Sequence, residues 1–129
     1  MEFPEELRYS KSHEWIRTSG AKAVCGITDY AQHELSDIVY VELPDVGREL
    51  EAGEACAVIE SVKIASDIYA PVSGKVTKIN MQLDAAPETV NADPYRAGWL
   101  FEIEMTDPAE ADDLMNAEEY KAHTEVETH

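Results

Sequence analysis

Positive charge is scarce in this sequence. The chain has 129 residues and carries 10 lysines and arginines against 27 aspartates and glutamates, a formal net charge of −17 at pH 7. Phosphate groups need cationic partners, so a surface this acidic argues against nucleic acids and anionic membranes as ligands. It favours docking onto basic patches of other proteins.

Long apolar runs are also missing. No stretch is long enough to span a bilayer as a helix. The N-terminal segment MEFPEELRYS has neither the basic start nor the apolar centre of a signal peptide. We therefore expect a protein of the bacterial cytoplasm, or of the mitochondrial matrix if the chain is a processed eukaryotic form.

Motifs of catalysis and metal binding are not recognisable. No glycine-rich loop follows a strand pattern, and no serine lies in a nucleophile elbow. Acidic residues are so numerous that no pair stands out for acid–base work. The histidines show no metal-ligand spacing, so no metal site is expected; they are His13, His33, His123 and His129. The sequence predicts a protein that is not an enzyme in its own right.

Cysteine is limited to two residues, Cys25 and Cys56. Both lie in apolar contexts. Buried reduced thiols are therefore predicted in preference to a disulfide.

Apolar residues make up 44% of the chain, enough for the core of one domain over residues 1–129. Alternating or β-branched segments predict strands at 13–17, 21–27, 37–43, 57–62, 64–70, 73–80 and 99–105. Ser19-Gly20 predicts a hairpin between the first two. Segment 28–36 predicts a helix with Thr28 as its N-cap, and the stretch before residue 99, rich in Asp, Pro and Asn, predicts a loop.

The C-terminal segment changes character. Asp107 followed by Pro108 is a capping pattern, and Asn116 with Glu119 repeats it before a second helix through Lys121. Residues 123–129 are expected to be frayed. The chain therefore predicts a mostly β body with one internal helix and a helical tail.

A weak internal echo supports a two-sheet arrangement. LEAGEACAVIE (50–60) resembles YRAGWLFEIEM (95–105) when the two Ala-Gly pairs are superposed. A turn and strand used twice would make a β-sandwich with approximate two-fold symmetry.

One lysine stands between two apolar strands, in AVIESVKIASDIYAPVSGKV (57–76). The simplest interpretation of Lys63 is a solvated side chain that guards a turn or a strand edge. The alternative is a covalent attachment point, because a protruding hairpin is accessible to a modifying enzyme and a lysine stem is long and flexible. The pattern alone leaves both open.

The residues around Lys63 and along nearly the whole chain resemble the glycine cleavage system H protein family. The segments that carry the resemblance are SHEW (12–15), GITDYAQ (26–32), DIVYVELPDVG (37–47), AGE (52–54), IESVKIASDIYAPVSGKV (59–76), VNADPYRAGWL (90–100) and DPAEADDLMNAEEYK (107–121). ESVK with the downstream ASD and APVSG is highly specific. The implied fold is a barrel-sandwich hybrid of the lipoyl and biotinyl carrier type, with the lysine on a hairpin.

The resemblance implies roles for six residues. Lys63 would carry lipoate in amide linkage. Glu60 and Gly74 match positions associated with recognition by the lipoylating enzymes. Ser12, Glu14 and Asp67 match positions that hold the amine of a loaded arm in a cleft, which suits the chemistry because a carboxylate stabilises an ammonium. Glu14 and Asp67 could instead be ordinary surface acids. Tyr30 and Leu35 could line the cleft or belong to the core.

The implied function is that of a non-catalytic, lipoyl-bearing aminomethyl carrier. It would shuttle the methylamine group of glycine from the pyridoxal-phosphate glycine decarboxylase to the tetrahydrofolate-dependent aminomethyltransferase, and dihydrolipoamide dehydrogenase would reoxidise it. We expect a monomer, because an arm that visits three partners needs a free hairpin. The alternative is an H-like protein that acts mainly as a lipoyl donor for other lipoate-dependent enzymes.

Other carrier families fit less well. A biotin carrier would flank the lysine with methionines, and a lipoyl domain of a 2-oxoacid dehydrogenase would have Asp where Val62 stands. Ile64 departs from the resembled pattern, which commonly has alanine after the lysine, and it could slow modification. A plain acidic interaction domain with an unmodified lysine is the remaining class.

Overall fold

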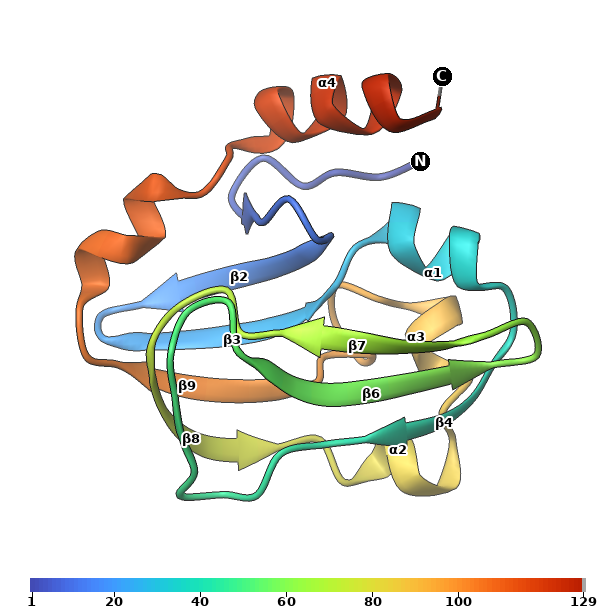
Figure 1. Ribbon diagram of the computed structural model, residues 1–129, viewed down its shortest axis with the longest axis horizontal. Coiled ribbons are helices and arrows are strands. Elements are labelled where there is room, and N and C mark those ends of the chain that lie inside the picture. Colours follow the sequence, from blue (N-terminus) through green and yellow to red (C-terminus); the bar gives the residue numbers. More distant parts are fainter. Residues whose placement is uncertain (129) are drawn as a thin grey trace.

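The computed structural model describes residues 1–128, which form two β-sheets with short helices around them (Figure 1). The strands are β1 (Arg8–Tyr9), β2 (Glu14–Ser19), β3 (Lys22–Ile27), β4 (Ile38–Glu42), β5 (Glu49–Leu50), β6 (Ala55–Ser61), β7 (Ala65–Tyr69), β8 (Gly74–Ile79) and β9 (Phe101–Met105). One sheet has the order β1-β2-β3-β9-β8-β5 and the other the order β4-β6-β7. Every pairing within them is antiparallel.

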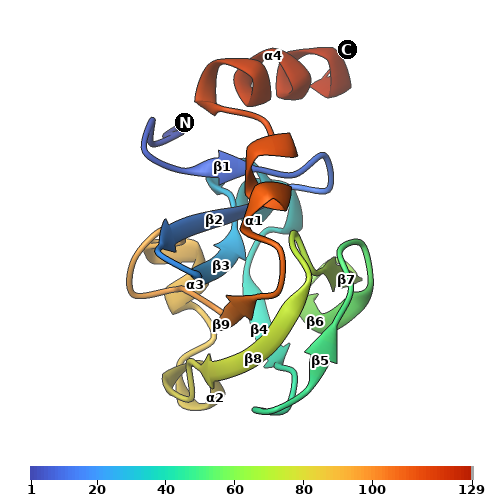
Figure 2. The same cartoon turned by 90° about the vertical axis from the view of Figure 1, so that its left-hand side faces the viewer.

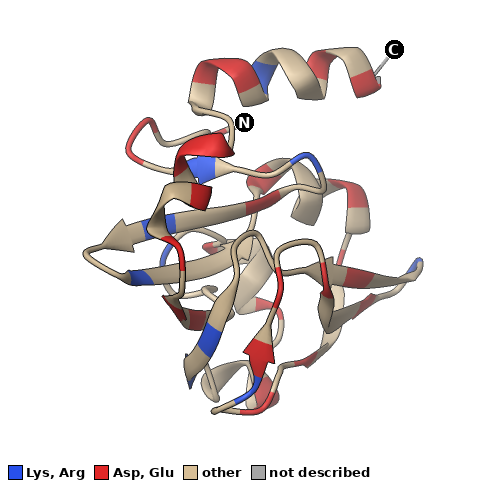
Figure 3. Ribbon diagram, turned by 60° about the vertical axis from the view of Figure 1, so that its left-hand side comes forward, with Lys and Arg blue, Asp and Glu red and all other residues tan. Residues whose placement is uncertain are grey.

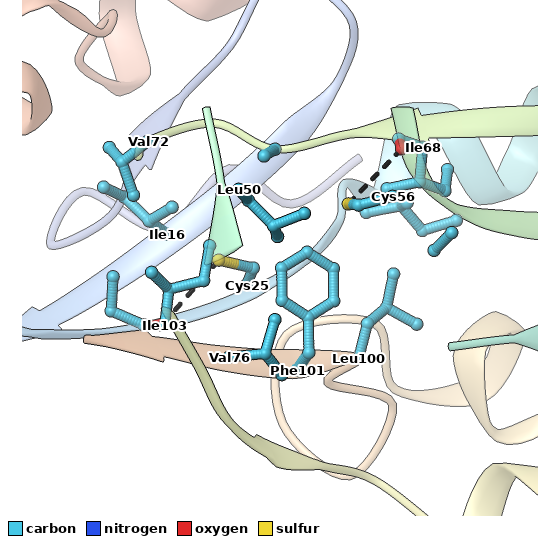
Figure 4. Close-up of a cluster of buried hydrophobic side chains, with 14 of the residues drawn as sticks. Ile16, Cys25, Leu50, Cys56, Ile68, Val72, Val76, Leu100, Phe101 and Ile103 are labelled. Carbon is cyan, nitrogen blue, oxygen red and sulfur yellow. Dashed lines mark hydrogen bonds between the residues drawn. The ribbon is translucent and has the colours of Figure 1, made fainter. Parts of the chain in front are cut away.

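The two sheets share one hydrophobic core, so the predicted mostly β sandwich is confirmed. Phe101 and Ile103 from the larger sheet and Ile59 from the smaller one are fully buried in the same cluster, part of which is drawn in Figure 4. The two segments of the internal echo each form a turn and a strand, and these strands, β6 and β9, lie in different sheets.

Both cysteines are free thiols inside this core, as predicted. The thiol of Cys56 donates to the carbonyl oxygen of Ile68 at 3.5 Å (Figure 4). Burial raises the pKa of the Cys56 thiol to about 12 and that of Cys25 well above its ordinary value. These thiols are therefore packing groups and not nucleophiles.

The helices are α1 (Asp29–Leu35), α2 (Gln82–Ala85), α3 (Thr89–Ala92), the 3-10 helix η1 (Pro108–Asp113) and α4 (Ala117–Thr128). Thr28 caps α1 as predicted, because its hydroxyl accepts from the amide of Ala31 at 3.2 Å. The loop prediction before residue 99 was wrong in detail, since α2 and α3 lie there. Each is a single turn without a side-chain cap, so the usual sequence signals are missing. Buried Leu83 and Val90 hold them to the core.

The C-terminal helix begins as predicted but ends later. The amides of Asn116 and Glu119 donate to each other's side chains at 2.9 and 2.8 Å, which is a complete capping box. α4 then continues to Thr128, so the predicted end at Lys121 and the fraying of 123–128 were wrong; residue 129 lies outside the described residues. Tertiary contacts hold the extension, because the His123 Nε2 lies 3.1 Å from the carbonyl oxygen of Lys11 and the Glu127 Oε2 lies 2.7 Å from the His13 Nε2. Figure 2 shows α4 beside β1 at one end of the molecule.

The acidic residues are spread over helices and strands alike, with few basic residues between them (Figure 3). Within residues 1–128, no helix has the length and apolar character needed to cross a bilayer.

Candidate functional site

Lys63 lies in the tight turn between β6 and β7, and its side chain is exposed. Ser61 builds this turn, because its hydroxyl oxygen accepts from the amides of Lys63 at 3.1 Å and Ile64 at 3.2 Å. Val62 and Ile64 flank the lysine and are 65% and 57% exposed. The prediction that Lys63 stands at the tip of an exposed hairpin is confirmed. Ile64 makes the tip more apolar without burying the lysine.

The hairpin tip is held against the end of α1. The amide of Val62 donates to the carbonyl oxygen of Asp37 at 3.0 Å. The Lys63 Nζ donates to the carbonyl oxygen of Glu34 at 3.2 Å. A backbone carbonyl is a weak restraint on an exposed ammonium, so the lysine amine remains accessible for reaction.

Beside this tip lies a cavity of about 290 Å³, which we call the α1–β7 cleft. It is lined by Ser12, His13, Ile27, Tyr30, Ala31, Glu34, Leu35, Ser66, Asp67, Ile68 and Glu127. Glu34, whose carbonyl contacts the lysine amine, is part of its wall. The Lys63 amine therefore contacts one of the residues that line the cleft. Ser12 and Asp67 line it as the sequence indicated, and so do Tyr30 and Leu35.

Glu14 lies behind this cleft and is 2% exposed, so it is not the surface acid that the sequence left possible. Its Oε1 accepts from the hydroxyls of Ser10 and Ser12, both at 2.5 Å, and its Oε2 accepts from the amide of Tyr69 at 3.1 Å. Among residues 1–128 no ion pair reaches it. Burial raises the pKa of the Glu14 carboxyl, although the three donors act in the opposite direction. Asp67, by contrast, is exposed.

This buried acid makes the stability of the chain depend on pH. A carboxyl whose pKa is higher in the folded than in the unfolded state destabilises the fold when ionised, and the penalty disappears as the pH falls through the raised pKa. Wild type should therefore gain stability relative to Glu14→Gln as the pH falls from 7 towards 4.5. Urea unfolding of both proteins across this range measures the difference. A difference in unfolding free energy that stays constant with pH would show that the Glu14 carboxyl has the same pKa in the folded and unfolded states.

The two other residues singled out from the sequence lie in different surroundings. Glu60 is exposed at the end of β6, where it pairs with Ala65 of β7, close to the hairpin tip. Gly74 is buried in β8 of the other sheet. A Cβ atom there would overlap the carbonyl oxygen of Glu104 and the side chain of Ile103. Gly74 therefore serves close packing of β8 on β9 and presents no side chain to a partner.

Several residues of the site were missed from the sequence. Ser10 and Ser61 act through hydroxyl hydrogen bonds that no pattern singled out. His13 and Glu127 meet at the rim of the cleft, with the His13 Nε2 2.7 Å from the Glu127 Oε2, although 114 positions separate them. The four-residue spacing of His123 and Glu127 on a capped helix was an available signal. Burial lowers the pKa of the His13 imidazole.

Known proteins resemble this chain in sequence and in fold. The family profile described as "Glycine cleavage H-protein" matches residues 7–127. A "Glycine cleavage system H protein" of Anaeromyxobacter sp. (strain K) is 53% identical over 125 residues, which cover 97% of this chain and 98% of the relative. One from Thermus thermophilus is 51% identical over 127 residues, covering 98% and 99%. The crystal structure of a glycine cleavage system H protein from Mycobacterium marinum matches with a TM-score of 0.86 at 38% identity, over 94% of this chain and 98% of that one.

Proposed function

Because the chain belongs to the glycine cleavage H-protein family, we propose that it is the lipoyl-bearing aminomethyl carrier of the glycine cleavage system, with lipoate in amide linkage to Lys63. One observation carries the proposal: the Nζ of the exposed Lys63 donates at 3.2 Å to the carbonyl oxygen of Glu34, a residue that lines the α1–β7 cleft. An attached arm could extend to a partner enzyme or fold back along its own carrier.

The residues present suit such an arm. The hairpin tip is exposed on both sides of Lys63, so a lipoylating enzyme can reach the amine. Lipoate held by Lys63 would supply the dithiolane chemistry that takes up the aminomethyl group of glycine and would leave a dithiol once that group is passed on. The protein itself would hold, orient and shield the arm, and we infer that it performs none of the bond breaking.

The cleft offers two kinds of contact for a loaded arm. Tyr30 and Leu35 provide an apolar wall that excludes water from the carried group. Asp67 at the rim and Glu14 behind it supply negative charge for the cationic amine, and Ser12 joins the two because it lines the cleft and donates to Glu14. Glu14 is buried without a cationic partner among residues 1–128, so a nearby ammonium group would favour its carboxylate form and relieve part of the desolvation penalty.

The partners follow from this role. The carrier would meet the pyridoxal-phosphate decarboxylase, the tetrahydrofolate-dependent aminomethyltransferase and dihydrolipoamide dehydrogenase, presenting the same hairpin to each. A net charge of −17 favours basic docking surfaces on them. We propose that the protein works as a monomer in the bacterial cytoplasm, or in the mitochondrial matrix if a eukaryotic form is processed.

Glu60 and Gly74 contribute to lipoylation in different ways. Glu60 is exposed near the tip and can contact a lipoylating enzyme directly. Gly74 is buried, so its contribution is through the fold that presents the hairpin.

Reconstitution distinguishes the carrier from a lipoyl donor. The lipoylated chain is added to the three purified partner enzymes, and release of labelled carbon dioxide from carboxyl-labelled glycine is followed. A carrier makes this release depend on its own concentration. A chain that passes its lipoyl group to other lipoate-dependent enzymes, yet gives no glycine-dependent release, would establish the donor role instead.

Removing the charge of Glu14 should shorten the life of the loaded state. Glu14→Gln keeps an oxygen that can accept from the serine hydroxyls but loses the attraction to the amine. A hydrogen bond to a charged group contributes about 1.5–3 kcal/mol, so the carried group should be lost about 10- to 150-fold faster. Ammonia release from the loaded chain, without the aminomethyltransferase, measures the rate. Glu49→Gln is the matched control, because Glu49 is exposed on β5 and does not line the cleft. Equal rates in all three proteins would remove Glu14 from the amine site.

A further inference from the structure

Two histidines and a glutamate meet where α4 crosses the loop between β1 and β2. His123 and Glu127 are one turn apart on α4, and the His123 Nε2 lies 3.0 Å from the Glu127 Oε1. His13 comes from the loop and places its Nε2 2.7 Å from the Glu127 Oε2. One potential ligand atom from each residue lies within 4.8 Å of the others. The side chain of His13 is 17% exposed, that of His123 24% and that of Glu127 39%, so the cluster is partly buried.

These contacts could be ordinary hydrogen bonds between histidines and a carboxylate. Three features favour a further role. Both imidazoles place the same nitrogen, Nε2, against one carboxylate, and the His123 Nε2 also lies 3.1 Å from the carbonyl oxygen of Lys11. The ligand types are two imidazoles and a carboxylate, a set that binds zinc in proteins with water as the fourth ligand. Zinc bonds of about 2.0–2.2 Å place tetrahedral ligand atoms roughly 3.3 Å apart, so small side-chain rotations would suffice.

The surroundings of His13 provide the support that a metal-binding histidine needs. Its Nδ1 lies 2.8 Å from the Tyr120 hydroxyl, which in turn lies 2.6 Å from the hydroxyl of Thr28. Hydroxyls both donate and accept, so this chain can run in either direction. With the proton on Nδ1 and donated to Tyr120, the Nε2 lone pair faces the cluster. Such an outer hydrogen bond orients the ring and selects its tautomer.

We propose that His13, His123 and Glu127 form a zinc site that fastens α4 to the rim of the α1–β7 cleft. This site is separate from Lys63 and does not depend on the carrier function. His13 and Glu127 also line the cleft, so a bound ion would connect the far end of α4 to that wall. Among the described residues, this is the one group of histidine, cysteine and acidic side chains whose ligand atoms converge closely enough for an ion.

The test uses the full chain without an affinity tag, made in lipoate-starved cells so that no arm thiols can bind the ion. Zinc ions are titrated by calorimetry after chelator treatment. We expect one zinc ion per chain. His123→Ala and Glu127→Gln should each weaken binding at least about tenfold, since even outer-shell changes cost 10–100-fold. Saturating zinc should raise the Tm of wild type by roughly 5 °C or more and leave these variants nearly unchanged.

His33→Ala is the matched control, because His33 is an exposed histidine on α1 outside the cluster. It should bind zinc as wild type does. Circular dichroism verifies that the variants are folded. If His123→Ala does not fold, Glu127→Gln still tests the site. Absence of zinc binding to wild type, undiminished binding to both cluster variants, or loss of binding in His33→Ala would each overturn the proposal.

Discussion

Replacing Lys63 with arginine should abolish carrier activity and leave the fold unchanged. A guanidinium does not take up lipoate in place of the ε-amine, so no arm would be attached. The side chain is exposed, and the contact of its Nζ is with a backbone carbonyl that another cation can also reach. The expected change in unfolding free energy is within about 0.5 kcal/mol, as for other surface substitutions. Glycine-dependent release of carbon dioxide in the reconstituted system measures the activity.

Lys78→Arg is the matched control, because Lys78 is an exposed lysine on β8, outside the hairpin. It should support release at the wild-type rate. Activity in Lys63→Arg above that of a reaction without the chain would place the working group elsewhere and contradict the assignment of Lys63.

The second large effect is on stability, at Gly74. β8 is paired on both sides, because Gly74 lies opposite Met105 of β9 and Leu50 of β5. The atoms that an added Cβ would overlap include the backbone oxygen of Glu104, which cannot move without disturbing this pairing. Gly74→Ala should therefore cost about 3 kcal/mol of unfolding free energy and lower the Tm by roughly 10 °C. Thermal and urea unfolding measure both quantities.

Gly20→Ala is the control that distinguishes steric overlap of an added Cβ from strain of the backbone. Gly20 has a φ of +60° and nothing within 4 Å of an added Cβ, so alanine there should cost only about 1 kcal/mol.

Lipoylation of Gly74→Ala, assayed at a temperature where the variant is folded, tests the role of Gly74. Normal lipoylation is expected if Gly74 acts through the fold. Failure of the folded variant to be lipoylated would instead indicate direct recognition.

The sequence was most informative where structure depends on neighbouring residues. The alternation on both sides of Lys63 predicted the hairpin, and the pairing of Asn116 with Glu119 predicted the start of α4. It was least informative where distant segments meet. The last turns of α4 are held by contacts of His123 with Lys11 and of Glu127 with His13, and the buried Glu14 accepts from the amide of Tyr69, 55 positions away. No local pattern contains such contacts.

The same distinction applies to the cleft. Ser12, Glu14 and Asp67 were selected by resemblance, and the fold brings Ser12 and Asp67 to one cavity with Glu14 behind it. His13 and Glu127 were not selected, because the spacing of histidines along the chain does not reveal a cluster whose members come from opposite ends.

The most direct test of the central claim is peptide mass spectrometry of the chain made in lipoate-fed cells. The carrier assignment predicts one lipoyl amide per chain, located at Lys63 and at no other lysine. An unmodified Lys63, in cells whose other lipoyl proteins are modified, would contradict it. The hairpin would then not be a substrate for the lipoylating enzymes, and the exposed Ile64 beside the lysine would be the first residue to replace with alanine.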